Sequence, residues 1–176
     1  MSNYKTEIFN IKSVTHDTFS FKLVKPDNYE FKPEQATEVS LVKEAWKDEK
    51  RPFTFTSLPE SEYLEFIIKT YPDHQGVTDQ LRMIKSGDAL EIGDAWGAIE
   101  YKGEGVFLAG GAGVTPFIAI LRHLSKEGEI GDNKLIFANK SPDDIILKDE
   151  FESLLGNNFI NILDDSGNEN YPEGRI

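Results

Sequence analysis

Apolar and polar residues alternate along several short segments in the first hundred residues of the chain. The clearest examples are residues 19–23, which read FSFKL, and residues 63–69, which read YLEFIIK; shorter apolar segments occupy 39–42 and 90–92. A period of two is typical of strands that bury one face, and turns rich in Pro, Gly, Asp and Ser separate these segments. Many short strands at this spacing predict a closed or nearly closed antiparallel barrel.

One short helix is expected within this region, directly after Gly76. Val77, Leu81 and Ile84 recur at the spacing of one helical face, and Thr78 is placed to cap the first turn. The helix is therefore predicted to pack its apolar face against the barrel.

In the remaining part of the chain the period changes, and strands alternate with helices. Compact apolar strands are predicted at 105–109, 134–138 and 159–163. The helices between them carry apolar stripes at Phe117, Ile120, Leu121 and Leu124, and at Leu147, Phe151, Leu154 and Leu155. This alternation predicts parallel strands joined by crossover helices. We therefore expect a β-barrel domain at 1–102 and an α/β domain at 103–176.

Composition narrows the classes of partner. Thirty-one acidic residues against nineteen basic ones give a formal net charge of −12. A field of this sign repels phosphate backbones and anionic membrane surfaces, so neither nucleic acid nor a membrane is an expected partner. The chain has no cysteine, which excludes disulfides and an iron–sulfur cluster held by its own thiolates. His16, His74 and His123 are scattered, so no metal site is expected.

The sequence contains no segment that is typical of an exported or membrane-spanning protein. The first residues lack the apolar run of a signal peptide, and no segment approaches the length that spans a bilayer. A cytoplasmic location is the expectation.

The strongest candidate for ligand binding is the sequence GGAGVTP at residues 110–116, between a predicted strand and a predicted helix. Glycine carries no Cβ, so a phosphate or a sugar can approach the backbone closely. Thr115 is placed to cap the helix, Pro116 suits its first helical position, and the free amides there attract an anion. A tight turn without a ligand is the alternative for a bare glycine cluster. The strand, cap, proline and amphipathic helix fall in register, which favours binding.

Two further segments carry candidate phosphate contacts. Residues 51–57 read RPFTFTS, in which Arg51 brings a fork of donors suited to a pyrophosphate. Phe53 lies on the same side of an extended strand and Thr54 on the other; an exposed arginine on a strand edge is the alternative interpretation. Residues 76–78, GVT, precede the short helix and form a second, weaker phosphate candidate.

These motifs, in this order, resemble the ferredoxin–NADP reductase superfamily over the whole chain, and most of all the short bacterial flavodoxin or ferredoxin reductases. The resemblance implies a Greek-key flavin-binding barrel followed by a parallel-sheet nicotinamide-binding domain. It implies hydride transfer from NADH or NADPH to bound FAD, with FMN the less favoured flavin, and electron transfer to an acceptor such as flavodoxin or ferredoxin. The implied flavin contacts are Arg51, Phe53, Thr54, Ile68, Lys69, Thr70, Gly76, Val77 and Thr78. The implied dinucleotide contacts are Gly111, Gly113, Thr115, Pro116, Asn139 and Lys140.

By the same resemblance, Arg51 holds the flavin pyrophosphate and Phe53 lies against the isoalloxazine. Thr54 is the candidate catalytic residue, because it would hydrogen-bond near the reactive flavin nitrogen. Asp143 and Asp144 would repel the extra phosphate of NADPH whereas Lys140 would attract it, and NADH is the expected donor.

The chain departs from the family pattern at four places. Phe53 replaces the usual tyrosine, PEQ at 33–35 stands for Pro-Gly-Gln, and DAWG at 94–97 stands for Gly-Pro-x-Gly. The family continues past the position of Ile176 with a helix–strand unit and a Cys-Gly-Pro motif. We therefore expect the second domain to be incomplete and the chain to belong to a longer protein. A non-catalytic flavin or nucleotide sensor with the same pockets is the alternative function.

Overall fold

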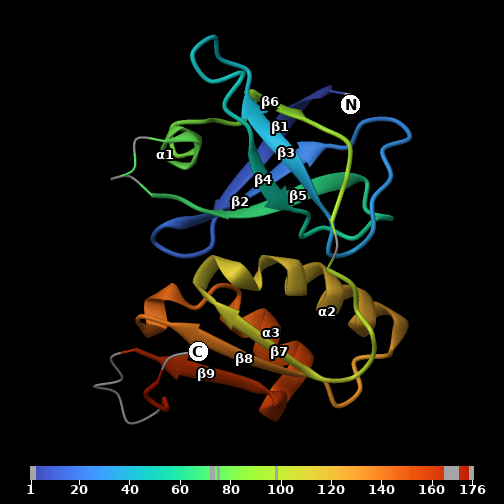
Figure 1. Ribbon diagram of the computed structural model, residues 1–176, viewed down its shortest axis with the longest axis vertical. Coiled ribbons are helices and arrows are strands. Elements are labelled where there is room, and N and C mark those ends of the chain that lie inside the picture. Colours follow the sequence, from blue (N-terminus) through green and yellow to red (C-terminus); the bar gives the residue numbers. More distant parts are fainter. Residues whose placement is uncertain (1–2, 72–73, 75, 98, 165–170, 175–176) are drawn as a thin grey trace.

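A computed structural model describes residues 3–71, 74, 76–97, 99–164 and 171–174. Six strands form one antiparallel sheet in the order β4-β3-β6-β1-β2-β5 (Figure 1). The elements are β1 Tyr4–Ser13, β2 Thr18–Val24, β3 Ala36–Leu41, β4 Arg51–Thr54, β5 Tyr63–Lys69, α1 Val77–Leu81 and β6 Ala89–Ile92. An isolated bridge between Phe55, just after β4, and Phe66 of β5 joins the two ends of the sheet. The predicted nearly closed barrel is confirmed.

The barrel interior is filled by the inward side chains of its strands. Leu64, Phe66 and Ile68 of β5 are at most 2 % exposed, and so is Phe21 of the neighbouring strand β2. Phe55 belongs to this core, and its ring lies against those of Phe31 and Phe66. The alternation read from the sequence therefore describes the inner face of these strands correctly.

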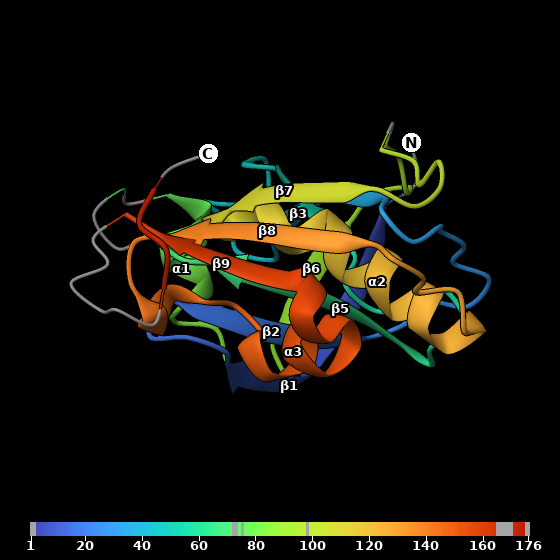
Figure 2. The ribbon, with the colours of Figure 1, turned by 90° about the horizontal axis from the view of Figure 1, so that it is seen from below.

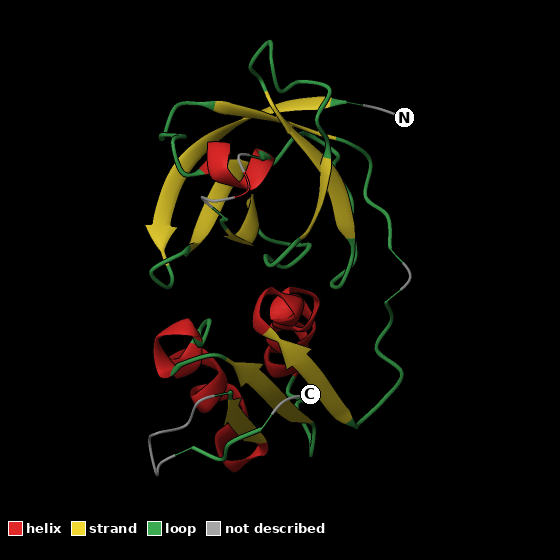
Figure 3. Cartoon of the chain, turned by 60° about the vertical axis from the view of Figure 1, so that its left-hand side comes forward, coloured by secondary structure: helices red, strands yellow, loops and turns green. Residues whose placement is uncertain are grey.

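The rest of the described chain forms a parallel sheet in the order β7-β8-β9. Its elements are β7 Val106–Gly110, η2 Gly111–Val114, α2 Thr115–Glu127, β8 Lys134–Asn139, η3 Pro142–Asp144, α3 Lys148–Leu155, η4 Gly156–Asn158 and β9 Phe159–Leu163. The predicted alternation of parallel strands and helices is confirmed. Helix α2 lies between this sheet and the barrel (Figures 1 and 3).

The two faces of the parallel sheet differ. Helix α2 lies on the side of the barrel, and Figure 2 shows the other face of the sheet in front of it, with α3 beside the edge strand β9. On that face Val106 and Leu108 are 56 % and 58 % exposed. In the described part of the chain, no helix is long and apolar enough to cross a membrane.

Strand β5 is buried on both faces. Glu65 and Ile67 point away from the barrel interior, yet they are only 6 % and 4 % exposed. Ile67 packs in the second hydrophobic core together with Ile118 of α2. The barrel and the α/β part therefore share a packed interface along this strand.

The expectation that Thr78 caps the helix α1 is wrong. The N-cap is Gly76, which is already extended, and Thr78 lies inside the helix with no side-chain capping bond at that end. The helix also ends at Leu81, so that Ile84 is buried beyond it rather than within it.

The expectation that Thr115 caps α2 is wrong as well. The 3-10 segment η2 continues directly into α2, so no extended residue precedes the helix, and Val114 occupies the N-cap position. Thr115 is the first helical residue, and its hydroxyl donates to the carbonyl oxygen of Ala112 at 3.1 Å. Pro116 is the second helical residue, one position later than predicted, because the helix begins at Thr115.

Candidate functional site

A cleft of about 510 Å³ opens between the end of β5 and the carboxyl ends of β7 and β8. Its lining residues are Lys69 and Tyr71 from the barrel, and Gly110, Gly111, Ala112, Ala138, Asn139, Lys140, Asp144 and Asp164 from the α/β part. Ligands of open α/β sheets bind outside the carboxyl ends of the parallel strands. The cleft brings together four residues predicted from the sequence: Lys69, Gly111, Asn139 and Lys140.

The glycine turn at residues 110–113 leaves open space at one wall of this cleft. Gly111 has a φ of +48°, in the left-handed region that favours glycine. A Cβ placed on Gly110, Gly111 or Gly113 would meet no protein atom within 4 Å beyond its chain neighbours. The turn therefore offers a bare backbone to a ligand, as the sequence motif predicts.

Asn139, the last residue of β8, supplies an unsatisfied amide. Its side chain is buried, but neither Oδ1 nor Nδ2 has a hydrogen-bond partner among the described residues. A buried polar group without a partner costs about 1–3 kcal/mol. Asn139 lines the cleft, so a turn of its side chain would present the amide to a ligand that both donates and accepts, such as a ribose, and the exposed Lys140 beside it offers a positive charge. The site therefore fits a nucleotide.

Lys69 is held at the cleft by two carboxylates. Its Nζ lies 3.0 Å from Oδ2 of Asp17 and 3.5 Å from Oδ1 of Asp144. The Asp144 carboxylate also accepts hydrogen bonds from the backbone N–H and the hydroxyl of Ser141. Burial lowers the pKa of Lys69, but pairing with Asp17 outweighs it and leaves the pKa raised. The lysine therefore stays charged beside the cleft.

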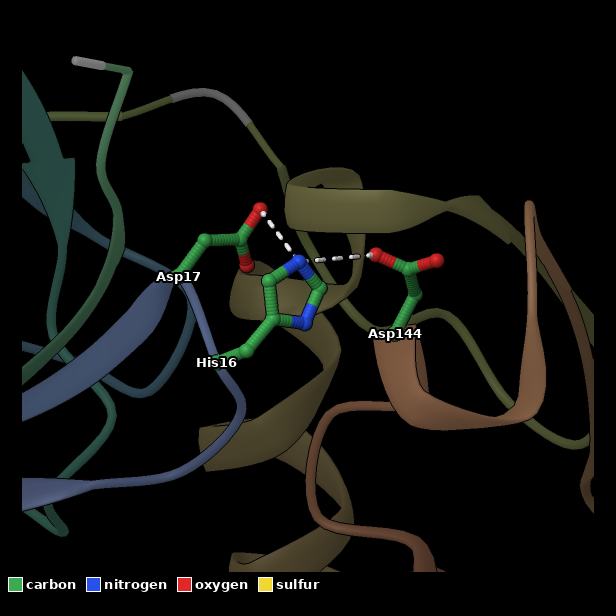
Figure 4. Close-up of side chains that lie close together, drawn as sticks. All are labelled: His16, Asp17 and Asp144. Atoms are coloured by element: carbon green, nitrogen blue, oxygen red, sulfur yellow. Dashed lines mark ion pairs between the residues drawn. The ribbon is translucent and has the colours of Figure 1, made fainter.

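His16 joins the same cluster, and Figure 4 shows its imidazole between Asp17 and Asp144. One ligand atom from each of His16, Asp17 and Asp144 lies within 4.8 Å of the others, a spacing that could suit a metal ion. The carboxylate oxygens of the two aspartates that face His16 also face the ammonium of Lys69, which would repel a metal cation. The cluster is therefore an ion-pair network that joins the β1–β2 loop to η3.

The predicted flavin contacts Arg51, Phe53 and Thr54 lie on β4, an edge strand of the six-stranded sheet. The Arg51 side chain is 49 % exposed; its guanidinium donates to the Lys50 carbonyl at 2.7 Å and pairs with Glu49 at 3.3 Å. Phe53 packs partly buried against the barrel core, and Thr54 is half-buried. This strand lies outside the lining of the cleft around Lys69.

Three other predicted flavin contacts are buried in the protein. Ile68 and Val77 belong to the barrel core. Thr70 is buried too, and both its backbone N–H and its hydroxyl donate to the Asp17 carbonyl at 2.8 Å. Gly76 and Thr78 are partly exposed at the start of α1, which has only five residues and hence a weak dipole.

The sequence interpretation did not identify Asp17 and Asp144 as partners of Lys69. Ser141 and Asp144 have the spacing of a capping box, a signal that places Asp144 at the start of a helical turn. Asp17 has no such local signal. It reaches Lys69 because β2 pairs with β5 in a register that sets Thr18 opposite Lys69.

Two of the departures from the family pattern meet each other in the barrel. Ala36 and Trp96 exchange backbone hydrogen bonds at 2.7 and 2.8 Å, and a Cβ on Gly97 would come within 3.3 Å of Gln35 Cα. Glu34, which stands where the family often has glycine, adopts a φ of +83°. Such a conformation costs a non-glycine residue about 1–3 kcal/mol. Burial also raises the pKa of Glu34 to about 7.

The variant Glu34→Gln is expected to make folding stability less dependent on pH. A raised pKa means that Glu34 contributes stability below its unfolded pKa of about 4.5 and loses that contribution as the pH rises to about 7. Because the side chain is partly exposed, solvent screening limits the loss to about 1–2 kcal/mol. Urea unfolding of both proteins at about pH 5.5 and about pH 8 measures it. An identical pH dependence in the two proteins would contradict the assignment.

Two family models match the chain in sequence. Residues 3–94 match the model of an FAD-binding domain, and residues 107–175 match that of an oxidoreductase NAD-binding domain. The reductase component of propane 2-monooxygenase from Rhodococcus jostii is 30 % identical over 162 residues, which are 88 % of this chain and 43 % of that protein. The NADH oxidoreductase HCR of Escherichia coli is 30 % identical over 155 residues, 85 % of this chain and 48 % of that protein. The chain thus spans less than half the length of each relative.

Solved structures share the fold. A ferredoxin NADP+ reductase from Neisseria gonorrhoeae with bound FAD and NADP superposes with a TM-score of 0.86 at 19 % identity, over 100 % of this chain and 74 % of that one. The CS-b5R domains of human Ncb5or give a TM-score of 0.83 at 26 % identity, over 99 % of this chain and 56 % of that one. With an FAD-binding barrel followed by an NAD-binding parallel sheet, the chain belongs to the ferredoxin–NADP reductase superfamily.

Proposed function

We propose that this protein transfers hydride from a nicotinamide dinucleotide to a bound FAD and passes the electrons to a separate acceptor. The observation that carries the proposal is the cleft in which the end of β5 meets the carboxyl ends of β7 and β8. A dinucleotide at the glycine turn would touch the α/β part and the barrel at once, through Gly111 on one side and Lys69 on the other. The two cofactors would therefore meet along β5.

The reaction makes few chemical demands on the protein. When bound, the two cofactors would supply the redox chemistry: the reduced nicotinamide would donate the hydride of a C–H bond, and the oxidised flavin would accept it on a ring nitrogen. The protein must hold the two rings in contact and exclude water between them. A site built from glycine backbone, an amide and a paired lysine suits this task.

The proposed contacts divide between two domains, 1–102 and 103–176. On the flavin side Arg51 holds the pyrophosphate, Phe53 packs against the ring system, and Thr54 hydrogen-bonds near the reactive nitrogen. The remaining flavin contacts are Ile68, Lys69, Thr70, Gly76, Val77 and Thr78. The dinucleotide contacts are Gly111, Gly113, Thr115, Pro116, Asn139 and Lys140.

Mixing the purified full-length protein with NADH or NADPH in the absence of oxygen tests the proposal. We expect a yellow protein whose flavin absorbance is bleached rapidly, and faster by NADH, because Asp143 is exposed beside Lys140 and repels an extra phosphate. A protein that binds both cofactors without bleaching would be the sensor of the alternative interpretation. A colourless protein that takes up no added flavin would overturn both.

Replacing Arg51 by alanine is expected to weaken flavin retention. The guanidinium is exposed on β4 and would pair with the pyrophosphate, and loss of a charged hydrogen-bonding partner costs about 1.5–3 kcal/mol. The change is measured as the flavin content that the protein retains after dialysis at a series of decreasing protein concentrations. Arg82→Ala is the matched control, because Arg82 is an exposed arginine just beyond α1 that pairs with Asp79. Equal flavin affinity in the two variants would refute the role of Arg51.

The acceptor is proposed to be a small redox protein such as flavodoxin or ferredoxin. The relative from Rhodococcus jostii is the reductase component of a monooxygenase, so its name implies a partner that receives electrons. We propose a cytoplasmic location on the sequence pattern. Reduction of purified flavodoxin and ferredoxin by NADH and catalytic amounts of this protein tests the choice of acceptor.

A further inference from the structure

Arg122 of α2 connects the barrel to both helices of the α/β part. Its Nη1 donates to Oε2 of Glu65 at 2.6 Å and to the carbonyl oxygen of Thr56 at 2.7 Å. Its Nε and Nη2 donate to the two carboxylate oxygens of Glu150 on α3, at 2.5 and 2.9 Å. One guanidinium therefore makes four hydrogen bonds to three segments that are distant in sequence.

The barrel side of this network is rigidly built. The Glu65 carboxylate also accepts hydrogen bonds from the hydroxyls of Ser20 at 2.8 Å and Thr56 at 2.9 Å. The backbone N–H of Glu65 donates to the hydroxyl of Ser57 at 3.0 Å. Burial raises the pKa of Glu65, but Arg122 and these hydrogen bonds outweigh burial and lower it. A buried carboxylate that stays ionised depends on its cation.

The fork geometry fixes an orientation as well as a distance. A guanidinium is planar, and its donors match a carboxylate in only a few arrangements. Beside this contact, Ile67 of β5 packs in the same core as Ile118 of α2. Apolar packing holds α2 against the strand. The fork of Nε and Nη2 fixes the guanidinium on Glu150 of α3, and Nη1, which donates to both Glu65 and the Thr56 carbonyl, restrains sliding or turning of α2 on β5.

Helix α2 and strand β5, which Arg122 joins, each have one end at the cleft. Helix α2 begins directly after the glycine turn that contains Gly111, and β5 ends at Lys69. Both residues line the cleft, Gly111 from the α/β part and Lys69 from the barrel. A shift of α2 along β5 would therefore move the proposed dinucleotide site relative to the flavin barrel.

We propose that Arg122, together with Glu65 and Glu150, is a positioning residue for hydride transfer, which sets the dinucleotide site at contact distance from the flavin. The inference rests on the proposed function. It assigns Arg122 no contact with either cofactor, since the guanidinium faces the network and not the cleft around Lys69.

The test compares Arg122→Met, Arg122→Lys and Glu65→Gln in the full-length protein with the control Lys126→Met. Lys126 lies on the same helix and pairs with Glu60, but both side chains are about half exposed, so its loss should change rates less than about twofold. Stopped-flow mixing with NADH gives the limiting rate of flavin reduction and the NADH dissociation constant separately. A misplacement of about 1 Å costs roughly a hundredfold in rate, so we expect a fall of that order for Arg122→Met with little change in the dissociation constant.

Arg122→Lys should recover part of the rate, because its ammonium still neutralises Glu65 without the fork, and Glu65→Gln should lie between the two. An unchanged limiting rate in Arg122→Met, or a loss confined to NADH affinity, would overturn the inference. Thermal unfolding provides a second readout: flavin release and loss of helical signal should coincide in the parent protein and separate in Arg122→Met. If NADH does not reduce the flavin of the parent protein, the proposed function fails. If flavin release and loss of helical signal still coincide in Arg122→Met, Arg122 does not couple the barrel to the α/β part, and the inference fails.

Discussion

Replacing Phe55 by alanine is expected to lower the free energy of unfolding by about 3–5 kcal/mol, the usual cost of removing a buried aromatic ring. Phe55 is fully buried, and its ring centroid lies 4.3 Å from that of Phe31 and 5.1 Å from that of Phe66. Folded domains are stable by only about 5–15 kcal/mol. This one substitution should therefore remove a large share of the total.

The loss should extend to flavin binding, because Phe55 directly follows the strand β4 that carries Arg51 and Thr54. Urea unfolding monitored by circular dichroism measures the stability, and flavin content after dialysis measures retention. Phe9→Ala is the matched control, since Phe9 is 45 % exposed on β1 and its removal should cost less than about 1 kcal/mol. Equal destabilisation by the two variants would show that the barrel core is not centred on Phe55.

The variant Gly110→Val is expected to weaken dinucleotide binding about a hundredfold, or about 2.7 kcal/mol, without unfolding the protein. Gly110 has φ −119° and ψ 125°, an ordinary strand conformation that valine favours. A Cβ there meets no protein atom within 4 Å, and the residue lines the cleft. The added isopropyl group should therefore occupy space that only the ligand needs.

Equilibrium dialysis with NADH measures the affinity, and the flavin content reports that the barrel is intact. Gly105→Val is the control, because Gly105 lies just before the same strand and outside the lining of the cleft. If Gly110→Val binds NADH as tightly as the parent protein, the dinucleotide does not lie at the glycine turn.

Periodicity predicted the fold because each element buries a face that repeats along the sequence. In β5, Leu64, Phe66 and Ile68 identify the inner face of the barrel, and the third strand of the parallel sheet was predicted at the bounds that it has. What periodicity did not reveal is that the other face of β5 is buried too. In a half-buried strand Glu65 is an ordinary outward polar residue and Ile67 is an apolar exception. The contacts of α2, through Arg122 and Ile118, explain why both side chains are buried.

The candidate site was predicted unevenly for a related reason. The glycine turn is local, so its open backbone follows from the sequence itself. The ion pairs of Lys69 join three segments that come together only through strand pairing and the docking of the α/β part. The two predictions of helix caps were wrong because a threonine caps a helix only when it occupies the N-cap position itself. Which residue occupies that position depends on how the preceding turn closes.

The double burial of β5 has a consequence for building new reductases from parts. Because the barrel and the α/β part follow one another in sequence, a designer could combine the barrel of one relative with the α/β part of another and place the junction in the connecting segment. In this protein such a hybrid would inherit Glu65 and Ile67 from one parent and the helix that covers them from the other. A foreign α2 without an arginine at the position of Arg122 would leave a buried carboxylate uncompensated. Successful hybrids should therefore be those that transfer this strand surface together with the helix it contacts, wherever the joint in the sequence is placed.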